Sequence, residues 1–258
     1  MRLITLLTDF GDTDHYVASV KAAIMKHLPM SQIVDISHKI QQFNLPHAAF
    51  VLNSVFREFP EGTIHLVSVN DQMQGGDIFI IAKIEGHFFV AMDNGLLSLI
   101  SDLEPEMVVR LNSQDSSSGT FPAKTLMVPA VIELCEGRSL SEIGQPSEGI
   151  RKMFNRHPRL THNQIMGQVI HVDHYGNLIT NINKSTFEKI GKNRKFTLSF
   201  SREKLSNLSV AYSEQDPGDC LAVFNINGEL EIAINAGNAS ELLGLHYNSP
   251  VMVNFIGE

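Results

Sequence analysis

Near its start the chain reads Leu3-Ile4-Thr5-Leu6-Leu7-Thr8-Asp9-Phe10-Gly11, an apolar run that ends abruptly in polar, turn-forming residues. An apolar run of this length is typical of a short buried strand. The following segment, Tyr16–Leu28, has apolar residues at helical spacing. The start of the chain therefore predicts a strand, a loop and a helix.

The same alternation continues along the first half of the chain. Ile33–Ile36 and Thr63–Val69 have the pattern of strands, and Pro46–Phe59 between them has that of a helix. This order predicts a mainly parallel sheet with helices on both faces, whose ligands bind at the carboxyl ends of the strands. We also expect a hairpin from residues 78–84 and 88–91, a strand over 107–111 and a helix over 126–136.

A polar segment with two prolines, residues 145–163, separates two kinds of pattern. Beyond it the helical spacing largely disappears, and short strand-like runs alternate with Gly, Asn and Asp. We expect an N-terminal α/β domain with a mainly parallel sheet over residues 1–160, and a C-terminal all-β, barrel-like domain over 161–258.

Composition excludes several classes of function. The 258 residues have a formal net charge of −8 and no long basic run, which argues against a nucleic-acid partner. No stretch approaches the roughly 18 apolar residues of a membrane span, and the first residues lack the pattern of a signal peptide. We expect a soluble cytoplasmic protein with neither a membrane nor a nucleic-acid partner.

Asp9 is the first candidate site residue, because it follows the first predicted strand directly. A carboxylate there can accept two hydrogen bonds from a vicinal diol such as a ribose 2′,3′-OH pair. The alternative is that Asp9 only closes a turn. Asp14, just before the predicted helix, either caps that helix or lies near a cationic ammonium group.

A metal site is a further possibility at the strand ends, where Asp9, Asp35, His38, Asp71 and Asp93 all occur. The chain lacks HxH, HExxH and CxxC spacings, however. We therefore expect no metal.

Two segments of the second domain have the composition of a site for a flat ligand. Asn177, in the polar elbow between two predicted strands, has the donor and the acceptor needed to read the edge of an adenine, although a simple hairpin turn explains it as well. Residues 233–239 are rich in small side chains, so that their backbone can approach a ring closely.

Taken together, the segments TDFG, DISH, DNGLLSL, DHYGNLITNI and LEIAINAGNA resemble, in this order, the S-adenosyl-L-methionine (SAM) hydrolases, also called SAM hydroxide adenosyltransferases. These enzymes are related to the fluorinating and chlorinating SAM enzymes. The resemblance implies an α/β domain, a β-barrel and a homotrimer that holds SAM between one subunit's N-terminal domain and its neighbour's C-terminal domain. It implies attack of water or hydroxide at the ribose C5′, giving adenosine and methionine, with SAM as substrate and no cofactor.

The resemblance also implies roles for single residues. Asp9 corresponds to the ribose-diol carboxylate, and Phe43 to an aromatic residue beside the reacting carbon. The other implied contacts are Asp14 and Asp173 to the methionine portion, Asn177 to adenine, Asn235 and Gly237 through their backbone to the same ring, and Phe224 and Asn227 in the same shell.

The chain departs from the family at the residues that hold the attacking water. Family members have an Asp, an Arg and a His in segments resembling VDPGVG..R and FHGRD. An ungapped match places Asn70, Asp77 and Pro122 at these positions, and Lys124 where the family has a second Arg. Asn70 and Asp71 are then the residues expected to direct water.

Three other functions stay open from the sequence. Loss of the three water-holding side chains favours a non-catalytic SAM-binding or adenosine-binding protein. The acids and histidines at strand ends would suit a metal-dependent hydrolase. Halogenation would need an anion pocket, to which Ser116–Ser118 could donate hydrogen bonds.

Overall fold

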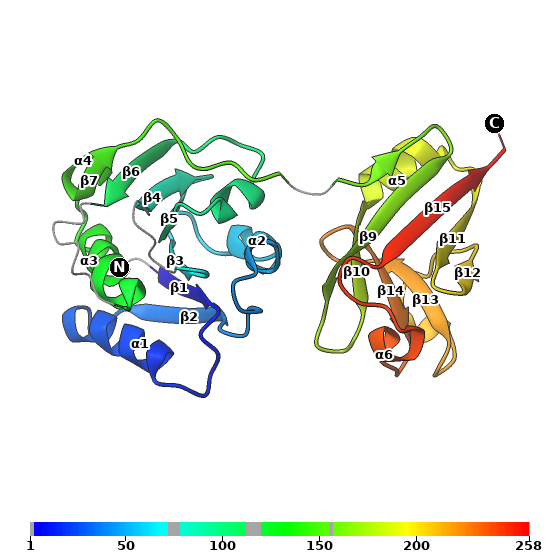
Figure 1. Cartoon of the computed structure of the whole chain (residues 1–258), viewed down its shortest axis with the longest axis horizontal. Coiled ribbons are helices and arrows are strands. Elements are labelled where there is room, and N and C mark those ends of the chain that lie inside the picture. Colours follow the sequence, from blue (N-terminus) through cyan, green and yellow to red (C-terminus); the bar gives the residue numbers. More distant parts are fainter. Residues whose placement is uncertain (1–2, 72–77, 112–119, 155–156, 258) are drawn as a thin grey trace. The chain divides into compact units, whose positions relative to one another are not determined.

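The structure, a computed structural model, describes residues 3–71, 78–111, 120–154 and 157–257. Its contacts divide the chain into two compact units, Met1–Asn155 and Arg156–Glu258 (Figure 1). The division falls a few residues before the boundary expected at 160, because Arg159 and Leu160 form a short strand that pairs within the second unit.

The first unit contains a seven-stranded mixed sheet in the order β2-β1-β3-β5-β4-β6-β7. The strands are β1 (Leu3–Thr8), β2 (Gln32–Ser37), β3 (Ile64–Ser68), β4 (Phe79–Ile84), β5 (His87–Met92), β6 (Met107–Leu111) and β7 (Gly144–Pro146). Strands β2, β1, β3 and β5 are parallel, whereas β4, β6 and β7 add antiparallel pairs.

The expected mainly parallel sheet is therefore only partly found. The predicted hairpin is confirmed as β4 and β5, joined by Glu85 and Gly86, both of which have positive φ (48° and 77°). Two successive residues of this conformation make the tight turn that matches the twist of paired strands. The hairpin reverses the chain, and the strands that follow β5 in the order of the sheet, β4, β6 and β7, each pair antiparallel with their neighbours.

Helices cover both faces of this sheet. Two helices, α1 (Tyr16–His27) and α3 (Val128–Cys135), pack on one face, and α2 (Leu45–Asn53) packs on the other. Shorter turns are Phe56–Glu58, Leu96–Leu99, Ala123–Met127 and α4 (Leu140–Ile143). The helix expected over 46–59 ends at Asn53, where the backbone bond from Val55 N–H to the carbonyl of Leu52 (3.1 Å) tightens the last turn.

The site is placed by the way the chain leaves β1 and β2. The strand β1 is buried on both sides, with Ile4 and Leu6 in the core under α1 and Leu7 in the core under α2. The chain passes from β1 to α1 on one face, and from β2 to α2 on the opposite face. Such a switch point opens a crevice at the carboxyl ends of the strands.

The second unit is an antiparallel, barrel-like sheet in the order β12-β11-β15-β9-β10-β14-β13, with β8 also on β9. The strands are β8 (Arg159–Leu160), β9 (Gln164–Val172), β10 (Leu178–Asn183), β11 (Lys195–Phe200), β12 (Glu203–Leu205), β13 (Cys220–Phe224), β14 (Glu229–Ile234) and β15 (Pro250–Ile256). The helical elements are α5 (Lys184–Gly191), Tyr212–Glu214 and α6 (Ala239–Leu243).

Strand β9 gives this sheet its curvature. Its first half pairs with β15 and its second half with β10. The change occurs between Gln168, which still pairs with Pro250, and Val169, which pairs with Thr180. At the neighbouring Gly167, a Cβ would lie 2.5 Å from Cγ1 of Ile182. Only glycine lets the strands approach so closely at this bend.

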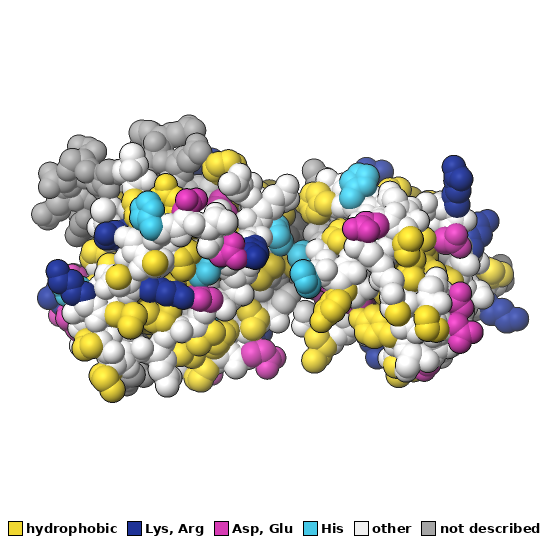
Figure 2. Space-filling view, turned by 90° about the horizontal axis from the view of Figure 1, so that it is seen from below, with side chains coloured by type: hydrophobic (Ala, Val, Ile, Leu, Met, Phe, Trp, Pro, Cys, Tyr) yellow, Lys and Arg dark blue, Asp and Glu magenta, His cyan; other side chains and the backbone are white. Residues whose placement is uncertain are grey.

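The surfaces of both units are mixed in character. On the face shown in Figure 2, acidic and basic side chains of the described residues are interspersed with apolar ones. Within the described ranges, none of the helices combines the length and the apolar character that a bilayer span requires.

Candidate functional site

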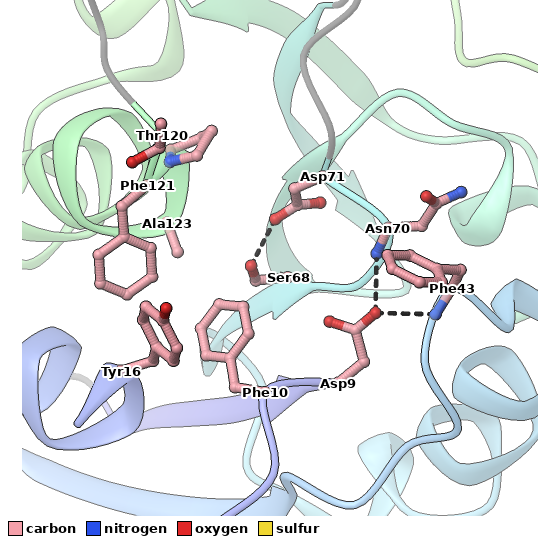
Figure 3. A pocket seen from close by; sticks show the side chains of 11 residues that line it. Asp9, Phe10, Tyr16, Phe43, Ser68, Asn70, Asp71, Thr120, Phe121 and Ala123 are labelled. Atoms are coloured by element: carbon pink, nitrogen blue, oxygen red, sulfur yellow. Dashed lines mark hydrogen bonds between the residues drawn. The ribbon is translucent and has the colours of Figure 1, made fainter. Parts of the chain in front are cut away.

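Asp9 lies at the carboxyl end of β1, in the crevice, and its carboxylate is fixed by two backbone donors. The N–H groups of Phe43 and Asn70 donate to Asp9 Oδ2 at 3.0 and 3.2 Å. Figure 3 shows the second carboxylate oxygen on the side of the pocket. Asp9 therefore does more than close a turn, because it joins three loops and keeps one oxygen for a ligand.

The two donors have an unusual backbone conformation. Phe43 and Asn70 both have positive φ, 62° and 55°. Left-handed residues other than glycine cost roughly 1 kcal/mol and persist where the surroundings over-determine them. Here the conformation aims both N–H groups at one carboxylate. The loops after β2 and β3 therefore keep a strained backbone conformation that points both N–H groups at the Asp9 side chain.

A pocket of about 560 Å³ opens beside Asp9. Its lining residues come from the end of β1, the start of α1, the loop after β2, the end of β3 and the segment before α3: Asp9, Phe10, Tyr16, Phe43, Ser68, Asn70, Asp71, Thr120, Phe121, Pro122 and Ala123. One wall is aromatic, because the rings of Phe10, Tyr16 and Phe121 meet in tilted or edge-to-face contacts with centroids 5.4 to 5.9 Å apart (Figure 3).

Asp71 is the second carboxylate of the pocket. Ser68 Oγ donates a short hydrogen bond to its Oδ2 (Figure 3), whereas Oδ1 is buried and receives no hydrogen bond from the described residues. The pKa of Asp71 is raised to about 7, mainly by burial and also by the neighbouring Asp9, against the lowering effect of hydrogen bonding to Ser68 and to the backbone of Val69. Asp71 therefore exchanges a proton near neutral pH.

The pocket has a negative rather than a positive character. Among its described lining residues there are two aspartates and no Lys or Arg. Lys124, which stands where the family has an Arg, instead donates to Ser19 Oγ on α1 at 2.9 Å. Pro122, at the family's His position, lines the pocket without a donor. Asp77, at the family's Arg position, lies outside the described residues, as do Ser116–Ser118.

Residues of two sequence motifs contact the loops that carry Asp9 and Asn70. His38, of the DISH segment, lies with Nδ1 2.8 Å from Thr8 Oγ1 and with Nε2 3.1 Å from Asp35 Oδ1. Asn94, of the DNG segment, donates to the carbonyl of Val69 at 3.0 Å. These contacts fix the two loops that present Asp9 and Asn70. Among the described residues, no group of three His, Cys, Asp or Glu side chains is placed to hold a metal ion.

The second unit has its own pocket, of about 600 Å³. It is lined by Asp173, Tyr175, Asn177, Tyr212 and residues 234–238. The structure thus brings together four of the residues expected to bind the ligand, which are Asp173, Asn177, Asn235 and Gly237.

Several polar groups of this second pocket already have hydrogen-bond partners within the unit. Asp173 accepts from the backbone of Tyr175 and Asn177 and from the Asn177 amide (2.8 to 3.0 Å), and the Asn235 amide donates to the carbonyl of Gln215 (2.7 Å). Asp173 therefore shapes the turn that presents the Asn177 side chain.

Three expected residues lie away from these pockets. Phe224 packs on Phe187 in the core of the second unit, and Asn227 lies in the adjoining turn. Both are at the opposite end of the β13–β14 hairpin from Ile234, so this chain does not bring them into the second pocket. Asp14 is exposed, and its place as N-cap of α1 is taken by His15, which makes no side-chain cap.

Apart from Phe43, sequence reasoning missed the aromatic lining of both pockets. Phe10, Tyr16 and Phe121 line the first pocket, and Tyr175 and Tyr212 line the second. Phe10 and Tyr175 each lie inside a recognised motif, TDFG and DHYGN, which was the available signal. The convergence of Phe121 with Phe10 depends on contacts across more than a hundred residues.

Comparison with known proteins extends over both units. The family model for the SAM hydroxide adenosyltransferase N-terminal domain matches residues 4–144, and that for the C-terminal domain matches residues 167–252. A protein of Methanocaldococcus jannaschii named (R)-S-adenosyl-L-methionine hydrolase is 30% identical, over 95% of this chain and 93% of its own. A fluorinase of an Actinoplanes species is 24% identical, over 91% of each chain.

Solved structures agree with this relationship. The crystal structure of an uncharacterized conserved protein from Thermotoga maritima has a TM-score of 0.89 and 27% sequence identity, and the match covers 98% of this chain and 100% of the other. A conserved hypothetical protein from Thermus thermophilus has a TM-score of 0.77 and 26% identity, with 99% and 100% covered. Because both domain models and a curated relative match it, the chain belongs to the SAM hydroxide adenosyltransferase family.

Proposed function

We propose that this protein hydrolyses SAM to adenosine and L-methionine, by attack of water at the ribose C5′. The observation that carries the proposal is the preformed Asp9 carboxylate in a pocket that combines acidic and aromatic groups, in a chain whose two domains both match the family. The names of its curated relatives support the same reaction.

The chemistry of the first pocket suits SAM. The sulfonium of SAM is a cation, and aromatic rings together with carboxylates attract cations. Asp9 accepts a hydrogen bond from the ribose diol through the oxygen that faces the pocket. Phe43, 55% exposed, lines the same pocket as Asp9.

The displacement requires little of the protein beyond position and a dry environment. Water forms a bond to C5′ while the C5′–S bond breaks, and sulfur keeps the electron pair, so that methionine leaves as a neutral thioether. The leaving group needs no proton, and the water proton must go to a base. Orientation of water in line with the breaking bond supplies much of the rate.

The second pocket is proposed to bind the adenine and methionine portions through Asn177, Asp173, and the backbone of Asn235 and Gly237. In the homotrimer that the resemblance implies, these residues come from a neighbouring subunit. No cofactor takes part in the proposed reaction.

Replacement of the family's Asp and His by Asn70 and Pro122 favours a second candidate, a non-catalytic SAM-binding or adenosine-binding protein. Incubation with SAM and chromatographic detection of adenosine and methionine separates the two. Release above the uncatalysed rate supports hydrolysis. Saturable binding of SAM by calorimetry without release would establish the second candidate instead.

The binding role of Asp9 is tested by the variant Asp9→Asn. Hydrogen bonds to a charged group contribute about 1.5–3 kcal/mol, so affinity for adenosine should fall about 10- to 100-fold. Asp102→Asn, the same change at an exposed position outside the pocket, is the matched control and should bind like the unchanged chain. Equal affinity of Asp9→Asn and the unchanged chain would contradict the ribose-binding role.

A further inference from the structure

We infer that His38 is a positioning residue for nucleoside binding, and that it acts through Thr8 on the loop that carries Asp9 and Phe10. The inference rests on the proposed function, because it gives the DISH segment a part in the binding of the adenosyl group. It is carried by the contacts that His38 makes on both sides of Asp9.

His38 is not among the residues that line the first pocket, but it contacts the loop after β1 at two points. Its Nδ1 lies 2.8 Å from Oγ1 of Thr8, the last residue of β1, and its carbonyl accepts a hydrogen bond from the N–H of Gly11 at 2.8 Å. Between these two points the chain carries Asp9 and Phe10, both of which line the pocket. One residue of the loop after β2 therefore holds the chain before and after Asp9.

The hydroxyl of Thr8 joins the histidine to the turn at Asp9. Thr8 is buried, and the N–H of Phe10 donates to its Oγ1 at 3.4 Å. A Thr hydroxyl that accepts from the residue two positions later closes a turn. The hydroxyl proton then points to Nδ1 of His38, which accepts it only if Nδ1 carries no proton itself.

Asp35 selects the form of the ring that can accept this proton. Nε2 of His38 is buried and lies 3.1 Å from Asp35 Oδ1, and Lys21 Nζ donates to the other carboxylate oxygen at 2.5 Å. Burial raises the pKa of Asp35, but the contacts with Lys21 and His38 outweigh it and hold that pKa below its ordinary value of 3.8, so the carboxylate is charged. A carboxylate this close favours the tautomer with the proton on Nε2, which leaves the Nδ1 lone pair for Thr8.

A second Thr–His contact on the same strand allows a positioning role to be separated from a structural one. Thr5 Oγ1 lies 2.7 Å from His65 Nδ1, and both residues are fully buried. Thr5 lies inside β1 and, unlike Thr8, is not next to a residue that lines the pocket. Loss of either hydroxyl should lower stability, whereas only loss of the Thr8 hydroxyl should loosen the loop that binds the ribose.

The test is calorimetric binding of adenosine by the intact chain and its variants, with urea unfolding run on each variant. Thr8→Val keeps the shape of the side chain and removes the hydroxyl, so that the affinity for adenosine should fall about 3- to 10-fold. With SAM, KM should rise by a similar factor while kcat changes little, because the ribose contact is made before and during the attack alike. Thr8→Ser retains the hydroxyl and should restore most of the affinity.

Thr5→Val is the matched control, which should lose stability but bind adenosine like the unchanged chain. Equal affinities of Thr8→Val and the unchanged chain, or equal losses of affinity in Thr8→Val and Thr5→Val, would overturn the inference and leave the proposed function intact.

NMR of the imidazole nitrogens of His38 in the unchanged chain tests the tautomer without any substitution. At pH 8 it should show the proton on Nε2, and a proton on Nδ1 would overturn the inference. Failure of the unchanged chain to bind either adenosine or SAM would overturn the proposed function and the inference with it.

Discussion

Replacing Asp71 by asparagine should stabilise the folded protein, and the gain should grow with pH. The folded-state pKa of Asp71, about 7, lies above its ordinary value of 3.8. A raised pKa means that the contribution of this group to stability is complete below pH 3.8 and is lost as the pH rises through 7. At 1.36 kcal/mol per pKa unit, the loss amounts to at most about 4 kcal/mol. The variant avoids this loss, because its side-chain amide carries no charge at any of these pH values.

The assay is urea unfolding of the unchanged chain and of Asp71→Asn at pH 5, 6, 7 and 8, followed through the transition of the first unit. We expect the stability difference in favour of the variant to increase by roughly 2–3 kcal/mol across this range and to level off above pH 7. Asp102→Asn should show no such trend. A stability difference that does not change with pH would refute the reasoning, because it would mean that Asp71 ionises in the folded protein as it does in the unfolded chain.

Three further predictions concern the rest of the molecule. His65 is fully buried between Thr5 Oγ1 (2.7 Å) and His87 Nδ1 (3.2 Å), and burial lowers its pKa from 6.5 to about 3. The free energy of unfolding should therefore fall by up to about 1.4 kcal/mol per pH unit below pH 6.5. Thermal melts should show this fall, and His65→Gln should reduce its slope. Gly176 has φ 86°, and a Cβ there would clash with the Asn238 amide that caps α6. Gly176→Ala should therefore lower the free energy of unfolding by about 2 kcal/mol, more than Gly218→Ala, whose Cβ meets nothing within 4 Å. Equal losses of stability in the two variants would contradict this interpretation. Sedimentation equilibrium should give three times the mass of one chain, and a monomer at micromolar concentration would contradict the homotrimer.

The apolar periodicity of the sequence was enough to predict most elements. The run at Leu3 is buried on both faces and had to become an inner strand, and residues 78–91 carried the turn signal of a hairpin. The direction of the remaining strands could not be predicted in the same way. Helices cover both faces of this sheet, so that the antiparallel strand β4 is buried almost throughout, as a parallel strand would be. The apolar pattern alone therefore does not reveal that β4 and β6 pair antiparallel.

The same distinction between sequence pattern and tertiary structure applies to the site. Residue order alone is enough to establish that Asp9 stands at a strand end and that the family's water-holding side chains are replaced. The raised pKa of Asp71 and its buried Oδ1 depend instead on the folded arrangement, since both arise from burial beside Ser68 and Asp9. Burial and proximity join residues that are distant in sequence, and the free energy of ionisation depends on those neighbours rather than on the order of the chain.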